Sequence, residues 1–269
     1  MKAKREKYIG LICTLLLAFG GLFLFLGSAP LLHPGTIAIG PAGDGLKDVF
    51  NTYYHARYDT TMWHSGSMNY PYGECVTYTG CQTYISIPIQ LLRRAGIVDL
   101  SGQVLLFVNL LAFAAVIACA LFLYLILYEL AVPWWMAVFG AVFITFLSPQ
   151  LSRMGSHITL GYAFILPCAI YLFMRWHQTR RWSHTAALAL LPCFPALAHP
   201  YYVIFLGAIW LIIWGYFVFY EHGQGLGKTA AAFQCIVQFV VPIALVMLLT
   251  KIGDVVSTEA RAKYNSYVA

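Results

Sequence analysis

Charged residues are scarce in this sequence. Of its 269 residues, 10% are Asp, Glu, Lys or Arg, whereas 61% are hydrophobic and the mean hydropathy is +0.74. A soluble domain carries about 25% charged residues, so the composition excludes an ordinary soluble globular protein. We therefore expect an all-α, polytopic membrane protein whose apolar stretches form transmembrane helices of about 20 residues each.

Basic residues interleaved with aromatic ones, which would suit a nucleic-acid surface, are also missing from the polar stretches. The formal net charge is only +6, and we expect no nucleic-acid partner. Part of the positive charge gathers just before the first apolar stretch, as is typical of a cytoplasmic flank beside anionic lipid. The residues of this N-terminal cluster are Lys2, Lys4, Arg5 and Lys7.

Cysteine spacings typical of zinc sites do not occur among the seven cysteines, so a structural zinc site is not expected. Five of the cysteines fall in apolar stretches, where a thiol behaves as a small hydrophobe. Cys75 and Cys81 lie instead in a polar loop. On an oxidising face of the membrane these two residues would form a disulfide, whereas in a reducing compartment they would remain thiols.

Apolar runs divide the chain into segments. The short connection 175–182 carries three Arg residues, which fits the inner side of a membrane, and the amphipathic stretch 85–100 is expected to lie along the bilayer surface. Individual spans are expected at 8–26, 105–128, 134–147, 158–174, 186–198, 201–220 and 229–250. The predicted organisation is a cytoplasmic N-terminus at 1–7, a first transmembrane helix at 8–27, a large folded outer (periplasmic) loop at 28–100 that ends in the interfacial helix, transmembrane helices two to seven within 101–250, and an outer C-terminal segment at 251–269.

The outer loop contains the glycine-rich run GPAGDGLKD at 40–48. Its glycines allow a tight turn that sets Asp44 close to the membrane surface, and a helix is expected to follow. Two carboxylates, an amide and an imidazole at helical spacing could serve a general base or a divalent-cation site. The alternative is an N-terminal helix cap at Asp44 followed by a solvated polar face. The residues that share this helical face are Asp44, Asp48, Asn51 and His55.

Two further connections bring polar groups to the same outer side. Arg153 could clamp a phosphate through its paired guanidinium donors, although an Arg that only snorkels at a lipid interface is the alternative. His199 follows a short, proline-broken span and is expected to line a cavity, or else to satisfy backbone groups that the break leaves free. The predicted cavity-lining residues are Asp48, His55, His199 and Tyr201.

One span, a large outer loop containing Asp44 and six further spans together resemble the conserved module of the C-type (GT-C) integral-membrane glycosyltransferases. Four motifs are similar to an uncharacterised bacterial branch of that superfamily. The resemblance implies a multi-pass protein of the bacterial inner (plasma) membrane with a cytoplasmic N-terminus. The motifs are GDGLK at 43–47, MNYPYGE at 68–74, GSH at 155–157 and HPY at 199–201.

The same resemblance implies roles for particular residues. Asp44 would act as the base or, with Asp48, as a ligand of a divalent cation, and Arg153 and His157 would bind the phosphate of a polyprenyl-phosphate-linked sugar donor. The superfamily's paired acidic motif is a single Asp here, with Asp48 a helical turn later. Members generally continue past seven spans, so a truncated chain, or a second chain that supplies further helices, is also implied.

We therefore expect a membrane glycosyltransferase (a hexosyltransferase) that moves a sugar to an acceptor on the outer face of the membrane. The first alternative is a non-catalytic or truncated membrane module that binds a lipid or a partner chain. The second is a transporter, which is disfavoured because no inverted repeat is visible. The acids nearest the spans also lie only at their ends, at Glu129 and Asp254.

Overall fold

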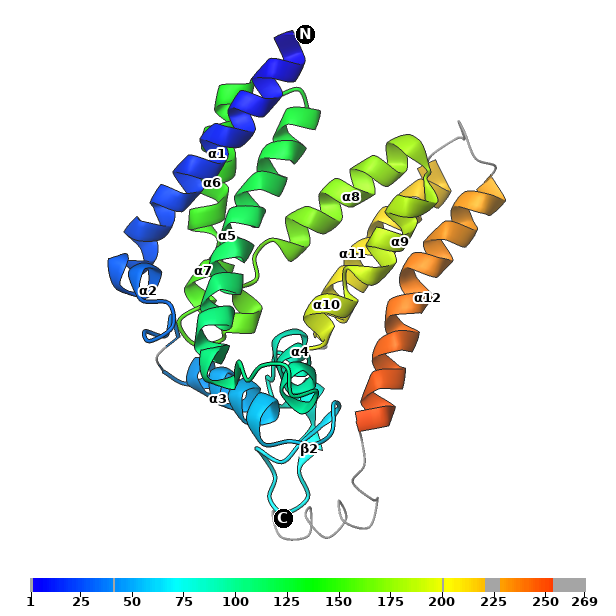
Figure 1. The fold of residues 1–269 in the computed structure, drawn as a ribbon. Coiled ribbons are helices and arrows are strands. Elements are labelled where there is room, and N and C mark those ends of the chain that lie inside the picture. Colours follow the sequence, from blue (N-terminus) through cyan, green and yellow to red (C-terminus); the bar gives the residue numbers. More distant parts are fainter. Residues whose placement is uncertain (1, 41, 200, 221–227, 254–269) are drawn as a thin grey trace.

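A computed structural model describes residues 2–40, 42–199, 201–220 and 228–253 of the chain (Figure 1). Helices dominate it, and the described strands form one short antiparallel pair. In chain order the elements are α1 (Lys2–Leu26), α2 (Ser28–Leu32), α3 (Asp44–Arg57), β1 (His64–Ser65), β2 (Glu74–Cys75), η1 (Val76–Tyr78), α4 (Thr83–Arg94), η2 (Ser101–Gln103), α5 (Val104–Glu129), α6 (Trp134–Leu147), α7 (Pro149–Arg153), η3 (Ile158–Gly161), α8 (Ile165–Thr179), α9 (Trp182–Leu190), α10 (Cys193–Ala196), α11 (Tyr201–Tyr220) and α12 (Lys228–Gly253).

Four described helical segments are long and apolar enough to cross a membrane. They lie in α1, in η2 with α5, in α6 with α7, and in α12. The protein is therefore all-α with several helices of membrane-spanning length, as the composition predicts, but the predicted number of seven spans is not supported. The four segments are Lys4–Leu26, Ser101–Glu129, Trp134–Arg153 and Thr229–Ile252.

Two of the remaining predicted spans are too short or too interrupted, because a hydrocarbon layer of about 30 Å needs about 20 helical residues. The predicted span 158–174 begins with the 3₁₀ turn η3, and α8 has 15 residues. The predicted span 186–198 is divided at Pro192 between α9 and α10. The third, 201–220, coincides with α11, whose fully described part, Tyr201–Tyr216, is a shorter apolar helix.

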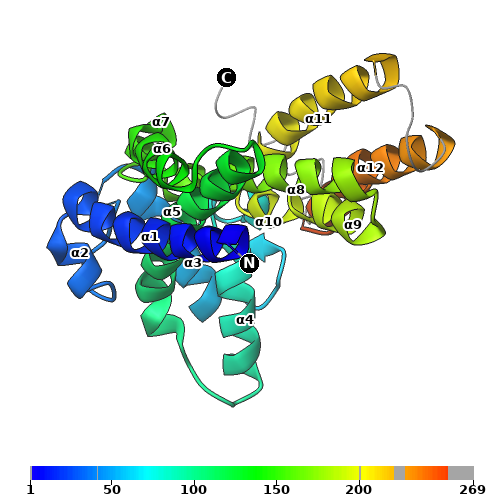
Figure 2. The same ribbon diagram turned by 90° about the horizontal axis from the view of Figure 1, so that it is seen from above.

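The long helices lie side by side in two groups, which Figures 1 and 2 show from two directions. One group contains α1, α5 and α6, and the other contains α8, α9, α11 and α12. Glycines let the first group pack closely: a Cβ atom on Gly10 would lie 2.1 Å from the Tyr124 hydroxyl oxygen, and one on Gly21 would lie 2.4 Å from the Phe146 ring.

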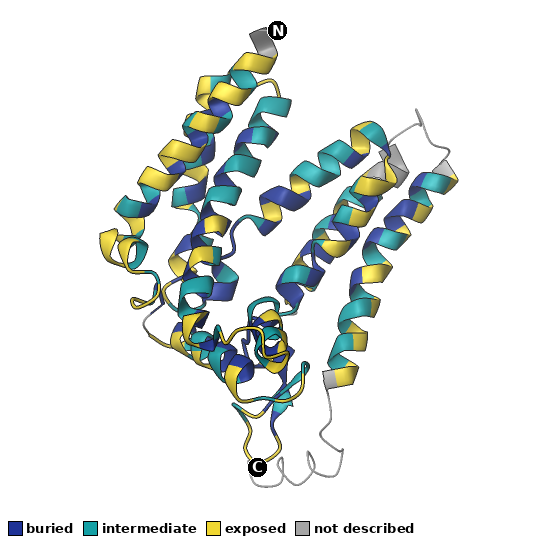
Figure 3. Ribbon diagram, in the orientation of Figure 1, coloured by how far each residue is buried: buried dark blue, intermediate teal, exposed yellow. Residues whose placement is uncertain are grey.

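The segment between α2 and α5 folds onto one end of the helices, away from the N-terminus (Figure 1). Buried residues concentrate where α3 and α4 meet (Figure 3). Gln90 of α4 ties the segment together, because its Nε2 donates to the carbonyl oxygens of His55, Asp59 and Thr61 at 2.8–3.2 Å. The predicted outer loop is therefore a folded unit that shares a core with the helices.

Helix α4 differs from the predicted interfacial helix 85–100. It ends at Arg94, after which Gly96 takes a φ of 69° that glycine adopts readily. Its side chains at Thr83, Ser86, Ile89 and Gln90 are buried, and α4 packs against α3. This helix therefore covers α3 with one face.

A buried amide in α5 holds the connection between α2 and α3. Asn109 Nδ2 donates to the carbonyl oxygens of Pro34 (2.7 Å) and Ile37 (2.8 Å). Its Oδ1 accepts from the backbone N–H of Ile39 (3.4 Å). The connection is thereby fixed against α5.

Candidate functional site

Asp44 is the first residue of α3, at the end of the helices where the segment between α2 and α5, the predicted outer segment, folds. The preceding Gly43 has a φ of 59°, and no side chain caps the helix. Asp44 Oδ1 lies 3.0 Å from Lys47 Nζ, and Oδ2 lies 3.1 Å from His157 Nδ1. The structure thus brings together Asp44 and His157, two predicted site residues from segments far apart in the sequence.

The Asp44 carboxylate sits in a positive environment. The hydrogen bond from Lys47 lowers the pKa of this carboxyl most. Partial burial opposes the shift, while the charges of Lys47, His157 and His199 add to it. The side chain is 44% exposed, so a ligand can reach it. Asp44 is therefore ionised at neutral pH and accepts hydrogen bonds, but it is a weak base as long as Lys47 is bound to it.

Asp48 lies one helical turn further along α3 and is 1% exposed. Burial raises the pKa of its carboxyl to about 7, the charge of Asp44 adds to this rise, and Lys47 and the Thr159 hydroxyl oppose it. The Thr159 hydroxyl reaches this carboxyl as a weak hydrogen-bond donor, but no hydrogen bond of normal geometry joins either carboxyl oxygen to the described residues. Gln82 Nε2 is also buried without a partner among them. The pKa values of Asp44 and Asp48 are therefore shifted in opposite directions, that of Asp44 down and that of Asp48 up.

Gly80 closes the space beside Asp48. It has a φ of 76°, and a Cβ atom at this position would lie 2.0 Å from Asp48 Oδ1. Only glycine combines this backbone conformation with such a close approach. The loop that follows η1 is thereby pressed against the Asp48 carboxyl, which explains how this carboxyl becomes buried.

Tyrosine hydroxyls surround the other side of this region. Tyr162 and Tyr84 both donate to Gln82 Oε1, at 2.5 and 3.3 Å. Tyr202 donates to the carbonyl oxygens of Thr159 and Leu160 at 3.0 and 3.1 Å. Burial raises the pKa of Tyr162 and of Tyr84, so both phenols stay protonated. This network joins α4, η3 and α11 around the buried carboxyl.

An apolar groove adjoins the network between α4 and α5. Its volume is about 400 Å³, which falls within the usual size range of small-molecule sites. Tyr84 belongs to both features, because its hydroxyl bonds Gln82 and its ring stacks on Phe194 with centroids 4.4 Å apart. The groove is lined by Tyr84, Ile85, Pro88, Ile89, Leu92, Leu100, Phe107, Leu111 and Phe194.

The other predicted site residues lie at different distances from this cluster. Burial lowers the pKa of His199, and the charges of Lys47 and His157 lower it further, so His199 is within electrostatic reach of the Asp44 cluster. The ring of Tyr201 stacks on His199 with centroids 5.6 Å apart, but Tyr201 is 57% exposed. Arg153 is exposed and has no ion-pair partner among the described residues.

His55 is held inside the outer segment and does not face the Asp44 cluster. Its Nδ1 lies 2.8 Å from Ser86 Oγ, and its Nε2 lies 3.0 Å from the carbonyl oxygen of Thr61. A carbonyl can only accept, so Nε2 carries the proton and Ser86 donates to Nδ1. Burial lowers the pKa of His55, with Asp59 opposing the shift. This neutral histidine fixes the chain after α3.

Cys75 and Cys81 are free thiols in the structure, and both are buried. Cys75 Sγ contacts Thr77 Oγ1 at 3.2 Å, and Cys81 Sγ contacts Ser86 Oγ at 3.4 Å. The predicted disulfide is therefore not formed here. Burial raises the pKa of the Cys81 thiol to about 12, which makes it unreactive at neutral pH.

The implied divalent cation does not fit the residues as they are arranged. Asp44 Oδ1 is occupied by the Lys47 ammonium, and the loop at Gly80 closes the space beside Asp48 Oδ1. Among the described residues, no group of three His, Cys, Asp or Glu side chains could hold a metal ion. We therefore assign no step to a metal.

Sequence reasoning missed Lys47, Gln82, Thr159 and the tyrosines of the network. Lys47 could have been found, because it lies three positions after Asp44 on a predicted helix. Gln82, Thr159 and Tyr162 have no shared spacing or motif. Only the packing of α4 and η3 on α3 brings them together.

Comparison with known protein families finds a match. The sequence model described as "Domain of unknown function (DUF6311)" matches residues 16–268. No curated protein and no solved structure matches the chain.

Proposed function

The chain belongs to the DUF6311 family, and we propose that it is a membrane glycosyltransferase with Asp44 at its centre. It would move a sugar from a polyprenyl-phosphate donor to an acceptor hydroxyl. In this proposal the end of the helices that carries α3 lies at the outer face of the bacterial inner membrane, and the N-terminus lies in the cytoplasm. The motif resemblance supports the reaction class, and the contacts of Asp44 support the residue.

The observation that carries the proposal is the pair of contacts made by Asp44. One carboxylate is held by Lys47 from its own helix and by His157 from the connection before η3. A carboxylate beside two groups that can bind phosphate suits a transfer reaction. The carboxylate accepts the acceptor's proton, while the basic groups hold the leaving phosphate. Exposed Arg153, one turn before His157, is a third candidate for the phosphate.

The proposed step forms one bond and breaks one. The acceptor oxygen attacks the anomeric carbon of the sugar, and the bond from that carbon to the phosphate oxygen breaks. Polyprenyl phosphate leaves with the bonding electron pair, and the acceptor proton passes to Asp44. Because Lys47 is the largest cause of the low pKa of Asp44, a donor phosphate that engages Lys47 would raise that pKa. Donor binding would therefore make Asp44 a better base.

The groove between α4 and α5 offers a place for the lipid chain of the donor. It is apolar and borders the Gln82–Tyr162 network through Tyr84. A polyprenyl chain in this groove would leave its phosphate on the side of α3. The proposal thus uses the groove for binding and the Asp44 cluster for chemistry.

The proposal is tested in membrane vesicles supplied with a panel of polyprenyl-phosphate sugars labelled in the sugar. We expect the protein to transfer label to a membrane acceptor and Asp44→Asn to lower the rate by roughly 10²–10⁴-fold. Asp99→Asn is the matched control, because Asp99 also pairs with a basic residue of the outer segment, Arg57, and should keep activity. Transfer by Asp44→Asn at the normal rate would overturn the assignment.

A lipid-binding module without turnover is the second candidate, and the apolar groove is the feature that favours it. Such a module, alone or with a partner chain that supplies further helices, would bind polyprenyl phosphate in the same vesicles. It would transfer no sugar from any donor. Saturable binding with no transfer across the whole panel would therefore favour this candidate over the enzyme.

A further inference from the structure

The chain reverses direction where α4 ends, over residues 91–99, which we call the α4 tip. The reversal is a Schellman motif. The backbone N–H of Ile97 donates to the carbonyl oxygen of Leu92 at 3.0 Å, and that of Gly96 donates to the carbonyl oxygen of Arg93 at 3.1 Å. Gly96 supplies the positive φ, 69°, that this motif requires. Because backbone groups satisfy these carbonyls, the arginines of α4 are not needed as caps, and the tip has a defined conformation.

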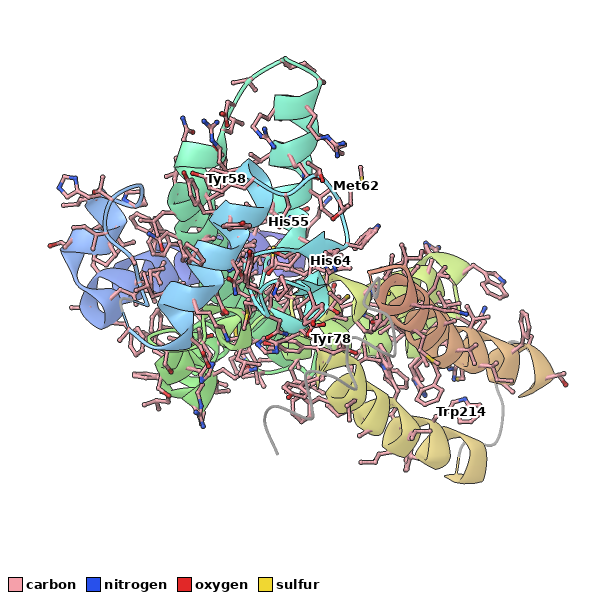
Figure 4. The ribbon with its side chains drawn as sticks, turned by 90° about the horizontal axis from the view of Figure 1, so that it is seen from below. His55, Tyr58, Met62, His64, Tyr78 and Trp214 are labelled. Atoms are coloured by element: carbon pink, nitrogen blue, oxygen red, sulfur yellow. The ribbon has the colours of Figure 1, made fainter. Side chains whose placement is uncertain are left out.

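The α4 tip exposes apolar side chains that the motif holds in place. Ile97 is 70% exposed, Leu91 is 45% exposed and Val98 is 43% exposed. Seen from the end of the molecule that carries α3, the tip extends past Tyr58, the residue that follows that helix (Figure 4). Exposed apolar residues this close together mark a surface that contacts lipid or another protein.

Positive charge accompanies this apolar patch. Arg93 Nε donates to the carbonyl oxygen of Ala56 at 3.2 Å, which holds the tip against α3, and Arg94 is exposed. Neither arginine forms an ion pair with a described residue. The acid of the tip, Asp99, is paired with Arg57 of α3. Three arginines and one aspartate therefore leave a net charge of +2 at this surface.

The α4 tip also lies at the boundary of a membrane-spanning segment. The segment Ser101–Glu129 is long and apolar enough to cross a bilayer, and it begins two positions after the tip ends. Helix α4 runs across the long helices rather than along them (Figures 1 and 2). A helix that crosses the hydrocarbon from Ser101 leaves the residues just before it at the level of the lipid head groups. At that level apolar side chains reach acyl chains, and arginines reach phosphates.

We propose that the α4 tip binds an anionic phospholipid, such as phosphatidylglycerol, at the bilayer surface. The guanidinium groups of Arg93 and Arg94 hold the head-group phosphate through paired donors, and the apolar patch contacts the acyl chains next to it. The net positive charge selects a lipid with a net negative head group over a zwitterionic one. The proposal concerns lipid binding alone and is independent of the glycosyl-transfer proposal.

The test places the photo-crosslinker p-benzoylphenylalanine at Ile97 of the full chain, in nanodiscs of equal parts dioleoyl phosphatidylglycerol and dioleoyl phosphatidylcholine. The two lipids have the same acyl chains, so the masses of the crosslinked adducts report which head group lies beside the tip. At low salt we expect adducts with phosphatidylglycerol to exceed those with phosphatidylcholine by roughly tenfold. The control position is Leu24, which is 90% exposed near the end of α1 that leads to α2, and it should give a ratio near one.

Removing the arginines tests their role. Arg93→Gln together with Arg94→Gln should lower the lipid ratio at Ile97 to that at Leu24. Arg94→Gln alone keeps the contact between Arg93 and Ala56 and should lower the ratio part of the way, so the test stands even if the double variant fails to fold.

An excess of glycerol phosphate, which has the head-group phosphate without acyl chains, should leave the lipid ratio at the α4 tip unchanged. Abolition of the preference by glycerol phosphate would mean that the arginines bind a free anion, and adducts with protein alone would mean that the tip contacts a protein. Either result overturns the proposal. Equal ratios at Ile97 and Leu24, or a preference that survives the loss of both arginines, overturn it as well.

Discussion

Replacing Asp48 with Asn should stabilise the protein at alkaline pH and have little effect at acidic pH. The folded protein holds the Asp48 proton up to a pKa of about 7, against an ordinary value of 3.8. Between these values the unfolded chain releases the proton and the folded chain keeps it. The free energy of unfolding therefore falls as the pH rises from about 4 to about 7 and stays low above that. Asparagine carries no charge and removes this fall.

The size of the effect follows from the two pKa values. Their difference corresponds to about 4 kcal/mol at 1.36 kcal/mol per pKa unit. This is an upper limit, because the new amide is buried where Asp48 now has no hydrogen bond of normal geometry to the described residues. For a chain of this size the upper limit corresponds to a melting temperature roughly 10 °C higher at pH 8.

The assay is thermal unfolding of purified protein in detergent between pH 5 and pH 8.5. Asp99→Asn is the control with the opposite sign. Hydrogen bonds from Ser101 lower the pKa of Asp99, and Arg57 adds to this shift, so the carboxylate of Asp99 favours the folded state and its loss should weaken the protein above the ordinary pKa. Parallel curves for the unaltered protein and Asp48→Asn across the whole range would refute the reasoning.

Two further predictions concern the contacts of helix α3. Gly80→Ala should destabilise the protein by about 1–3 kcal/mol more than Gly96→Ala in thermal unfolding. Both glycines have positive φ, but only at Gly80 would the new Cβ meet Asp48. Equal losses of stability would contradict the close contact between Gly80 and Asp48. Lys47→Met should raise the pKa of Asp44, since Lys47 is the main cause of its lowered value. Infrared titration of the carboxyl band, with Asp44→Asn added to identify the band, measures this shift, and an unchanged pKa would exclude the ion pair.

The local part of the site could be predicted from the sequence. Glycines before Asp44 predicted a turn, and the spacing of Asp48 and His55 predicted one helical face; α3 has that face. Spacing defines a face but not its surroundings. From Asp48 onward the face is buried rather than solvated, and His55 is hydrogen-bonded to Ser86 and Thr61 instead of facing Asp44.

The non-local part could not be read from the sequence. Gln82 and Tyr162 meet only because α4 and η3 pack on α3, and no spacing rule connects segments so far apart. His157 was nominated through a motif resemblance, and its contact with Asp44 needed the fold. The number of spans was overestimated for a related reason: hydropathy detects apolar runs, but the 3₁₀ turn η3 and the break at Pro192 divide two of them.

The amide of Asn109 has a consequence for biosynthesis. In the folded protein it bonds Pro34, Ile37 and Ile39, which are synthesised before α5. When α5 enters the lipid, this amide needs partners that hydrocarbon cannot supply. The segment 34–39 supplies them when it docks against α5, so we expect insertion of α5 and anchoring of this segment to be coupled.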